Sequence, residues 1–263
     1  MKRGSPKIFI FGAGRVGGTL YHSLLKKGID VARLTNGRAG DRRYSFERFI
    51  REINIFDVII LSVPDGEIEK VALKISKSVN KVNKKIILHT SGTVSFKALS
   101  ILKKKGFIIG SLHPYFSFYQ MRDDVTITDI KFTLFCEQKD LVQIKKTIEP
   151  AGIEPVYLED RFKIPYHISA VFVSNFTALF VRIAYELLCG IGFNQAQSEE
   201  FILSLLNSTI YNLKRFGIDW MITGPAIRRD KRVLDMHRRY LKEFERDLYR
   251  LYSTATRIIQ KIY

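Results

Sequence analysis

Short apolar runs alternate with amphipathic segments along the first 158 residues of the chain. Residues 7–11 and 31–34 are short β-rich runs, and between them residues 15–27 carry apolar side chains at helical spacing. Residues 56–63 form a continuous apolar run, as in a strand that is buried on both faces of a parallel sheet. Further strands are expected at residues 85–88, 107–110 and 132–136. This alternation predicts a doubly wound parallel sheet, an α/β fold.

The pattern changes after residue 158, where no further strand is expected. Residues 164–188 indicate one long apolar helix with Pro165 in its first turn. A second helix is expected from Ser198, as its N-cap, to residue 216, and a third amphipathic helix over residues 230–261. The sequence therefore predicts a Rossmann-like parallel-sheet domain over residues 1–158 and an all-helical domain over residues 159–263.

The net charge of +17 is high for a chain of 263 residues. Lysines and arginines are scattered over expected helix exteriors and loop ends, and no aromatic residues alternate with them as stacking platforms for bases. We therefore expect no nucleic-acid partner, although a nucleic-acid binder with one continuous basic face remains a weaker alternative. The excess charge also favours anionic ligands, which include phosphorylated cofactors.

Targeting and metal signals are absent from the pattern. The first apolar run, residues 8–11, is too short for a signal peptide, and no run is expected to reach the roughly 20 apolar residues of a membrane helix. Cys136 and Cys189 lack metal-ligand spacing and are expected to be reduced thiols among apolar neighbours. These features predict a cytoplasmic protein with no membrane partner and no metal site.

A glycine-rich motif of the form G-x-G-x-x-G follows the first expected strand and opens the first expected helix. In such a loop the first glycine permits a tight turn, the second lets the backbone approach a pyrophosphate, and the third allows close packing of helix on sheet. The helix N-terminus then offers free N–H groups to the phosphates. The residues expected to bind a dinucleotide here are Gly12, Ala13, Gly14, Arg15, Val16 and Gly17.

The end of the second strand indicates which dinucleotide binds. A carboxylate there would bind the ribose 2′-hydroxyl of NAD, but this chain has Thr35, Asn36 and Arg38 and no acid. These three side chains can donate hydrogen bonds and positive charge to a 2′-phosphate, so NADP is favoured over NAD. The alternative for Arg38 is an exposed loop cation.

Several separated motifs resemble a known family. Residues 57–65, Asp-Val-Ile-Ile-Leu-Ser-Val-Pro-Asp, resemble the fourth-strand signature of the pyrroline-5-carboxylate reductase and 6-phosphogluconate dehydrogenase superfamily. Several other motifs belong with them: residues 89–92 and 110–114, Tyr166-His167 with Ser174-Asn175, and Thr223-Gly224-Pro225 with Arg228 and Asp230. Together they resemble proteins that combine a Rossmann-like domain with a helical domain of unknown function, DUF2520. The resemblance implies an NADP-dependent oxidoreductase that forms a homodimer through its helical domain.

Two positions depart from the pattern of that family. Arg229 stands where the family usually has a glycine, so this residue is either strained or its turn is remodelled if the position requires a positive φ. Tyr115 stands where the family usually has a leucine after His-Pro, which would narrow a substrate pocket.

Polar residues at the ends of the later strands are candidates for chemistry. In an open α/β sheet the ligand lies beyond the carboxyl ends of the strands, where Ser62, Val63, Pro64 and Ser91 are expected to line the nicotinamide. His167 and His113 are the candidate proton donors. Each has a structural alternative, a cap or packing role for His167 and a turn for His113.

Positions near His167 extend this candidate site. Asn175 shares the helix face of His167 about two turns on and is a candidate amide partner, and Lys163, one turn before, is a possible substitute donor. The sequence therefore predicts an NADP-dependent reductase or dehydrogenase of a small carbonyl, imine or hydroxy acid. The alternative from another class is a non-catalytic sensor or scaffold that binds the dinucleotide.

Overall fold

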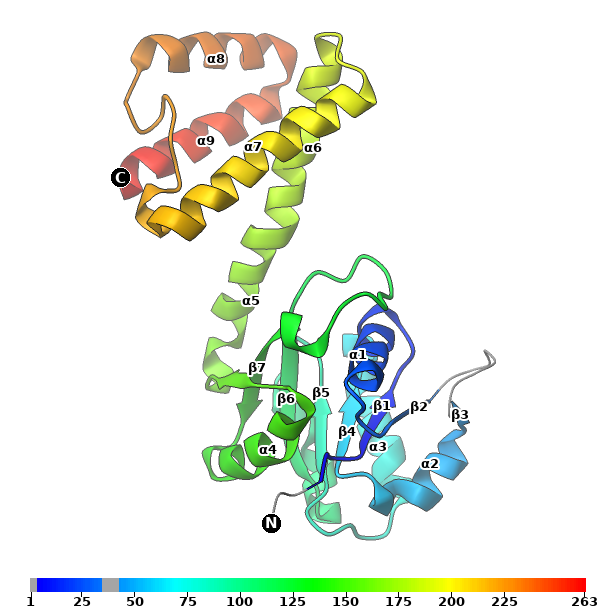
Figure 1. Cartoon of the computed structure of the whole chain (residues 1–263). Coiled ribbons are helices and arrows are strands. Elements are labelled where there is room, and N and C mark those ends of the chain that lie inside the picture. The colour runs from blue at the N-terminus through cyan, green and yellow to red at the C-terminus, as the bar shows by residue number, and fades with distance from the viewer. Residues whose placement is uncertain (1–3, 35–42) are drawn as a thin grey trace. The chain divides into compact units, whose positions relative to one another are not determined.

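The computed structural model describes residues 4–34 and 43–263. In this part of the chain one sheet has eight strands in the order β3-β2-β1-β4-β5-β6-β7-β8 (Figure 1). The strands are β1 (Ile8–Phe11), β2 (Val31–Leu34), β3 (Arg43–Tyr44), β4 (Val58–Leu61), β5 (Ile86–His89), β6 (Ile108–Tyr115), β7 (Lys131–Cys136) and β8 (Pro155–Tyr157).

All neighbouring strands pair in parallel except β6 and β7. The antiparallel register joins Gly110 to Cys136 and Tyr115 to Lys131. The connection between these two strands holds only the single turn Ile127–Asp129 and no crossover helix. Parallel pairing needs a crossover, so β7 returns in the opposite direction. The predicted Rossmann-like sheet is confirmed, with this antiparallel pair added to it.

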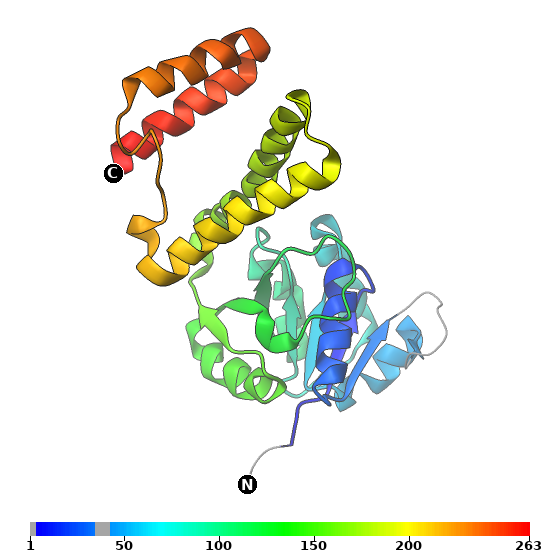
Figure 2. The same cartoon turned by 45° about the horizontal axis from the view of Figure 1, so that its top comes forward.

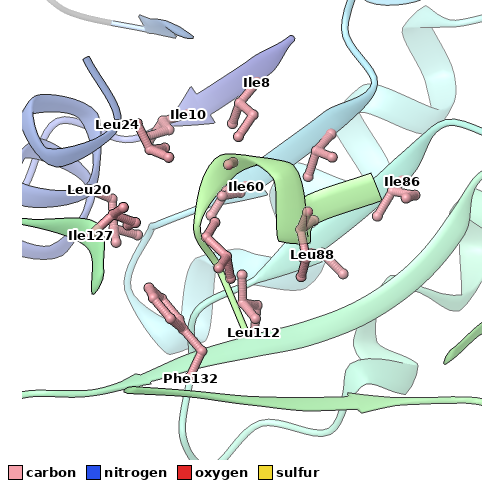
Figure 3. Close-up of a cluster of buried hydrophobic side chains, with 14 of the residues drawn as sticks. Ile8, Ile10, Leu20, Leu24, Ile60, Ile86, Leu88, Leu112, Ile127 and Phe132 are labelled. Atoms are coloured by element: carbon pink, nitrogen blue, oxygen red, sulfur yellow. The ribbon is translucent and has the colours of Figure 1, made fainter. Parts of the chain in front are cut away.

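Helices cover both faces of the sheet. On one face lie α1 (Arg15–Lys26) and α4 (Leu141–Ile148), and on the other lie α2 (Phe46–Glu52), α3 (Ile68–Ser78) and the 3₁₀ segment η3 (Phe96–Lys105) (Figures 1 and 2). Alternate residues of β1 point to opposite faces, as strand geometry requires. Ile8 and Ile10 join one buried cluster, which Figure 3 shows with Leu20 and Leu24 of α1, and Phe9 and Phe11 join the other.

The region after β8 contains helices and, within the described residues, no strand. A long helical run comprises α5 (Lys163–Val171), a π-helical turn (Phe172–Phe176) and α6 (Thr177–Gly190), and it is followed by α7 (Gln195–Phe216), α8 (Lys231–Phe244) and α9 (Arg246–Ile262). By its internal contacts the chain divides into two compact units, 1–176 and 177–263. The sequence boundary at residue 158 marks the end of the strands, whereas the contact boundary falls within the long helical run.

Two expected helices differ in their bounds. The cap of α7 is Asn194, whose side chain accepts from the Gln197 N–H, so this helix begins before the expected cap, Ser198. The expected helix over 230–261 is interrupted at Glu245, which is extended at φ −158° and ψ 122°. The side chain of Glu245 accepts from the backbone N–H of Asp247 and so caps α9.

The turn before α8 contains the departure from the family glycine. Arg229 adopts φ +54°, a left-handed conformation that L-residues with a Cβ rarely hold. Its guanidinium donates to the carbonyl oxygen of Gln260 at 3.0 Å. The turn therefore keeps the backbone shape that suits a glycine, and Arg229 carries the strain.

One helical run corrects an expectation from the sequence. Residues Asp160–Gly190 are long and apolar enough, with a mean hydropathy of 1.5 over the best window, to cross a membrane by length and composition alone. None of that window is buried inside the protein. Core helices of soluble proteins pass the same test of length and composition.

Candidate functional site

The glycine-rich loop joins β1 to α1. Gly12 has φ +123°, and a Cβ on it would lie 2.1 Å from the carbonyl oxygen of Ser62. A Cβ on Gly17 would lie 2.3 Å from the carbonyl oxygen of Gly12. By contrast, a Cβ on Gly14 would meet no atom within 4 Å. Gly12 and Gly17 are therefore required by the protein's own packing, whereas Gly14 leaves open space beside the backbone.

The N-terminus of α1 is suited to an anion. Its cap, Gly14, has no side chain to bond the first N–H groups, and the first turn contains no acidic residue. The unpaired N–H groups and the helix dipole together favour a phosphate at this position. These residues therefore fit a pyrophosphate for two reasons. The backbone at Gly14 is open to an approaching group, and no side-chain cap binds the first N–H groups of α1.

A cavity of about 420 Å³ lies at the carboxyl ends of β1, β4 and β5. It includes the start of α1, the residues after β4, the loop after β5 and one imidazole of α5. The lining residues are Gly14, Arg15, Val16, Ser62, Val63, Pro64, Asp65, Thr90, Ser91, Gly92, Thr93 and His167. The topology of a doubly wound sheet places ligands at this edge.

The loop after β5 is held by hydrogen bonds on both sides. The Ser91 hydroxyl donates to Asp65 Oδ2 at 2.9 Å, and the Thr93 hydroxyl donates to the same oxygen at 2.8 Å. Behind the loop, His89 is fully buried, and its Nδ1 accepts from the Ser91 N–H at 3.2 Å. Its Nε2 lies 3.3 Å from the carbonyl oxygen of Ser95, so the neutral tautomer with hydrogen on Nε2 fits both contacts.

Two more imidazoles flank Gly92. A Cβ on Gly92 would lie 2.6 Å from His167 Nδ1 and 2.8 Å from His113 Nε2, so only a glycine fits between the rings. The ring centroids of His113 and His167 are 5.9 Å apart. His167 lines the cavity, and its Nδ1 is buried without a hydrogen-bond partner in the described part of the chain. His113 lies behind Gly92, with Nδ1 2.9 Å from the hydroxyl of Tyr166.

Burial determines the charge of His89 and His113, the two inner histidines. Removal from water lowers the pKa of His113 to about 4, and the ammonium of Lys163 and the ring of His167 act in the same direction. Burial likewise lowers the pKa of His89 to about 4, again with help from Lys163. Both rings are therefore neutral at pH 7.

The residues predicted from the sequence are distributed around this cavity in three ways. Seven of the expected cofactor-binding residues line it, as does His167, while Gly12 and Gly17 support the loop from behind. Ala13 and His113 lie outside the lining. Thr35, Asn36 and Arg38 lie outside the described residues.

Asn175 is placed away from the cavity. It lies in the π-helical turn, is exposed, and accepts at Oδ1 from the hydroxyl of Ser174 at 2.7 Å. Two functional candidates received no site role from the sequence, Asp65 and Tyr166. The carboxylate of Asp65 ends the fourth-strand motif, whereas nothing in the sequence signals the contact between Tyr166 and His113.

Comparisons with known proteins agree with this architecture. A family model described as a Rossmann-like domain matches residues 1–114, and one described as a domain of unknown function, DUF2520, matches residues 130–256. Among curated proteins no match is found.

Solved structures share the fold over nearly the whole chain. A Bacteroides fragilis protein, provisionally described as an NADP oxidoreductase, is 22% identical, with a TM-score of 0.74 over 98% of each chain. A Thermotoga maritima protein is 22% identical, with a TM-score of 0.66 over 97% of each chain. The pyrroline carboxylate reductase of Plasmodium falciparum, solved with NADP bound, is 12% identical, with a TM-score of 0.62 over 98% of this chain and 100% of that chain. At these identities the likeness establishes the fold alone.

Proposed function

Because the chain combines a Rossmann-like domain with a DUF2520 domain, we propose that it is an NADP-dependent reductase or dehydrogenase of a small carbonyl, imine or hydroxy-acid substrate. One observation carries the proposal. The open backbone at Gly14 and the acid-free N-terminus of α1 face the same cavity as an imidazole, that of His167. An anion site next to a proton-transfer group is the minimum that hydride chemistry requires of a protein.

The cofactor-binding part of the proposal concerns the loops at the sheet edge. The N–H groups at the start of α1 would hold the pyrophosphate, with the Arg15 guanidinium beside it at the cavity. Ser62, Val63, Pro64 and Ser91 would line the nicotinamide half. When bound, the dinucleotide supplies or accepts the hydride.

His167 is the proposed proton donor or acceptor. Its Nδ1 is enclosed against Gly92 and has no partner in the described part of the chain, which leaves Nε2 as the ring nitrogen able to exchange a proton with a substrate. His113 is neutral at pH 7 and lies behind Gly92, so its proposed task is to hold its neighbours in place and not to donate as an imidazolium. Asn175 lies outside the cavity lining. Its proposed contact with the substrate is tested separately by the variant Asn175→Ala.

The preference for NADP rests on the sequence at the end of β2. Thr35, Asn36 and Arg38 would bind the 2′-phosphate, and no acid competes there. The P. falciparum reductase with NADP bound supports the same cofactor class.

Isothermal titration with NADPH and NADH tests the proposal. We expect saturable binding, tighter for NADPH, and loss of binding in Gly14→Val, because the added Cβ projects into the phosphate approach and meets no protein atom within 4 Å. Gly4→Val is the matched control, since Gly4 also has open space. Absence of binding by either nucleotide at high micromolar concentration would reject the proposal. Binding without turnover on any carbonyl or imine would favour the sensor alternative.

We also propose that two copies associate through the helical region in the cytoplasm. Apolar side chains of α6 and α7 are exposed, with Leu205 at 72% and Leu203 at 58%. Two grooves of about 790 and 560 Å³ lie along this helix pair. A second copy fits these grooves better than lipid does, because Arg182 and Glu186 form an ion pair within α6.

A further inference from the structure

Lys163 is an unusual residue for its position. It opens α5, yet only 1% of it is exposed, and it is among the largest fully buried side chains of the described chain. Lysines are almost never fully buried without a partner, because removal of an ammonium group from water is costly. No carboxylate lies within ion-pair distance of Lys163 in the part of the chain that the structure describes.

The ammonium group is instead held by two neutral oxygens and a ring. Nζ donates to the carbonyl oxygen of Ser91 at 2.8 Å and to the hydroxyl of Ser111 at 2.5 Å. It also lies 4.2 Å from the centre of the Phe135 ring. Ser91 follows β5 and Ser111 lies in β6, so Lys163 ties α5 to both strands. Lys163 does not line the cavity itself, whereas Ser91, whose carbonyl oxygen it binds, does.

The loop that Lys163 holds also depends on a neutral imidazole. His89 accepts the Ser91 N–H at Nδ1 while its Nε2 faces the Ser95 carbonyl oxygen. A protonated His89 has hydrogen on both ring nitrogens and cannot accept. Protonation would therefore break the bond that shapes the loop from Ser91 to Thr93.

We propose that Lys163 is a positioning residue of the candidate cofactor site, whose buried ammonium group fixes the Ser91 loop against β6 and places a positive charge next to His89 and His113, the two histidines that contact this loop. The proposal rests on the proposed function only in calling this cavity a cofactor site. Neutral donors would also satisfy the Ser91 carbonyl and the Ser111 hydroxyl, so the charge is what a lysine adds.

The charges around the two histidines fit this assignment. After burial, Lys163 is the largest factor that lowers the pKa of each ring to about 4. For His89 the opposing groups are Asp65 and Asp160. For His113 the opposing group is Asp65, while His167 acts in the same direction as Lys163, and the neighbouring Tyr166 hydroxyl has its pKa raised by burial and is neutral.

Lys163 itself keeps its charge at neutral pH. Burial lowers its pKa to about 8, and the carboxylates of Asp160 and Asp65 act against that effect. The ammonium form therefore prevails at pH 7 and is lost as the pH rises through 8.

Histidine titration by NMR, with no nucleotide present, tests the charge effect. In Lys163→Met we expect the midpoints of His89 and His113 to rise by about half a pH unit or more, since a like charge has been removed. Lys97 is exposed, and Lys97→Met is the matched control, in which the midpoints of His89 and His113 should not change. The midpoint of His237 is the internal reference and should be the same in all proteins. Unaltered midpoints of both inner histidines in a folded Lys163→Met protein would overturn the proposal.

A second measurement uses the wild-type protein and does not depend on the variant. Between pH 7 and 9.5 we expect the Ser91 carbonyl carbon, the Gly92 amide and the Lys163 Nζ signal to shift together, with a midpoint near 8. A Ser91 loop that does not respond while Lys163 loses its proton would overturn the proposal. Failure to bind NADPH would reject the proposed function and leave both of these results unaffected.

Discussion

Arg229 shows how one side chain stores strain in this chain. Its φ of +54° places it in the left-handed region, which costs a residue with a Cβ on the order of 1 kcal/mol relative to glycine. What Arg229 gains in return is a guanidinium bond to the exposed end of α9, at the Gln260 carbonyl. Because water and salt screen a charged contact at an exposed site, we expect the strain to exceed the gain.

Arg229→Gly is therefore expected to stabilise the protein. The free energy of unfolding should rise by about 0.5–1 kcal/mol, because glycine adopts this φ without steric cost. Urea denaturation at constant pH measures the change, and Arg239→Gly, at an exposed interior position of α8, is the control in which glycine should destabilise. A less stable Arg229→Gly protein would show that the guanidinium contact outweighs the backbone.

His167 is expected to carry proton transfer. With a carbonyl or imine substrate that the wild type reduces, His167→Gln should lower kcat by about 10²–10⁴ and leave NADPH binding unchanged. His22→Gln, on α1 outside the cavity lining, is the matched control. Asn175→Ala belongs in the same assay, and an unchanged rate would remove Asn175 from the mechanism.

At the scale of elements, the loop between β5 and η3 connects the sheet to the candidate site, because its residues Ser91, Gly92 and Thr93 line the cavity. Its shape depends on neutral His89, whose folded pKa of about 4 lies below the ordinary value of 6.5. Since the unfolded chain binds the proton more tightly, the contribution of neutral His89 to stability is complete above pH 6.5 and is lost as the pH falls from 6.5 toward 4. The shift corresponds to roughly 3 kcal/mol for a ring this deeply buried.

Stability should therefore fall steeply on mild acidification. We expect the urea midpoint to drop between pH 7 and pH 4.5 more than in a His89→Gln variant, whose side chain does not titrate. The quantity compared is the change of the urea midpoint with pH in each protein. A lower stability of His89→Gln at pH 7 therefore does not affect the comparison. His22→Gln should keep the wild-type slope, and equal slopes for all three proteins would contradict the assignment to His89.

The sequence predicted the carboxyl ends of the parallel strands well, because an apolar run followed by polar or turn residues marks where a strand ends. The apolar runs gave β1, β2 and β4 to β7, and the polar residues after them turned out to line one cavity. The pattern missed β3 and β8, which have two and three residues, too few for a period to show. It also missed the direction of β7, since apolar alternation is the same in both directions.

The burial of Lys163 and the contact between Tyr166 and His113 could not be predicted from the sequence. Lys163 lies at a helix start, where lysines are ordinarily exposed, and its burial follows from tertiary packing against β5 and β6. The Tyr166 contact with His113 joins residues 53 apart in the chain and follows from the same packing. The Rossmann-like and DUF2520 resemblance is confirmed by the family models, because its motifs are spread over both regions.

At the scale of the whole molecule, the exposed apolar surface of the helical region is the dominant feature. Leu205, Leu203 and Phe201 of α7 are all more than half exposed, and together with α6 they form two grooves. Contiguous apolar surface of this kind marks an interaction site in a water-soluble protein. A symmetric pair of copies is the simplest arrangement that covers it.

Light scattering on the eluting protein should give twice the chain mass of 30.4 kDa. Leu205→Glu should shift the mass toward one chain, because a charge placed in a desolvated groove is costly. Leu73→Glu, an exposed leucine of α3, is the matched control and should leave the mass unchanged. A wild-type monomer at micromolar concentration would exclude the homodimer.

The contrast between Gly14 and its neighbours has a consequence inside a cell. Substitution at Gly12 or Gly17 drives a Cβ into backbone, so the chain misfolds and the quality-control proteases remove it. A Cβ on Gly14 meets no atom within 4 Å, so we expect an alanine there to leave the fold intact and the protein to accumulate. If two copies associate as proposed, such a chain would pair with normal copies and inactivate part of the assembly. We therefore expect variants at Gly12 to be recessive, because the protein is lost, and variants at Gly14 to be dominant.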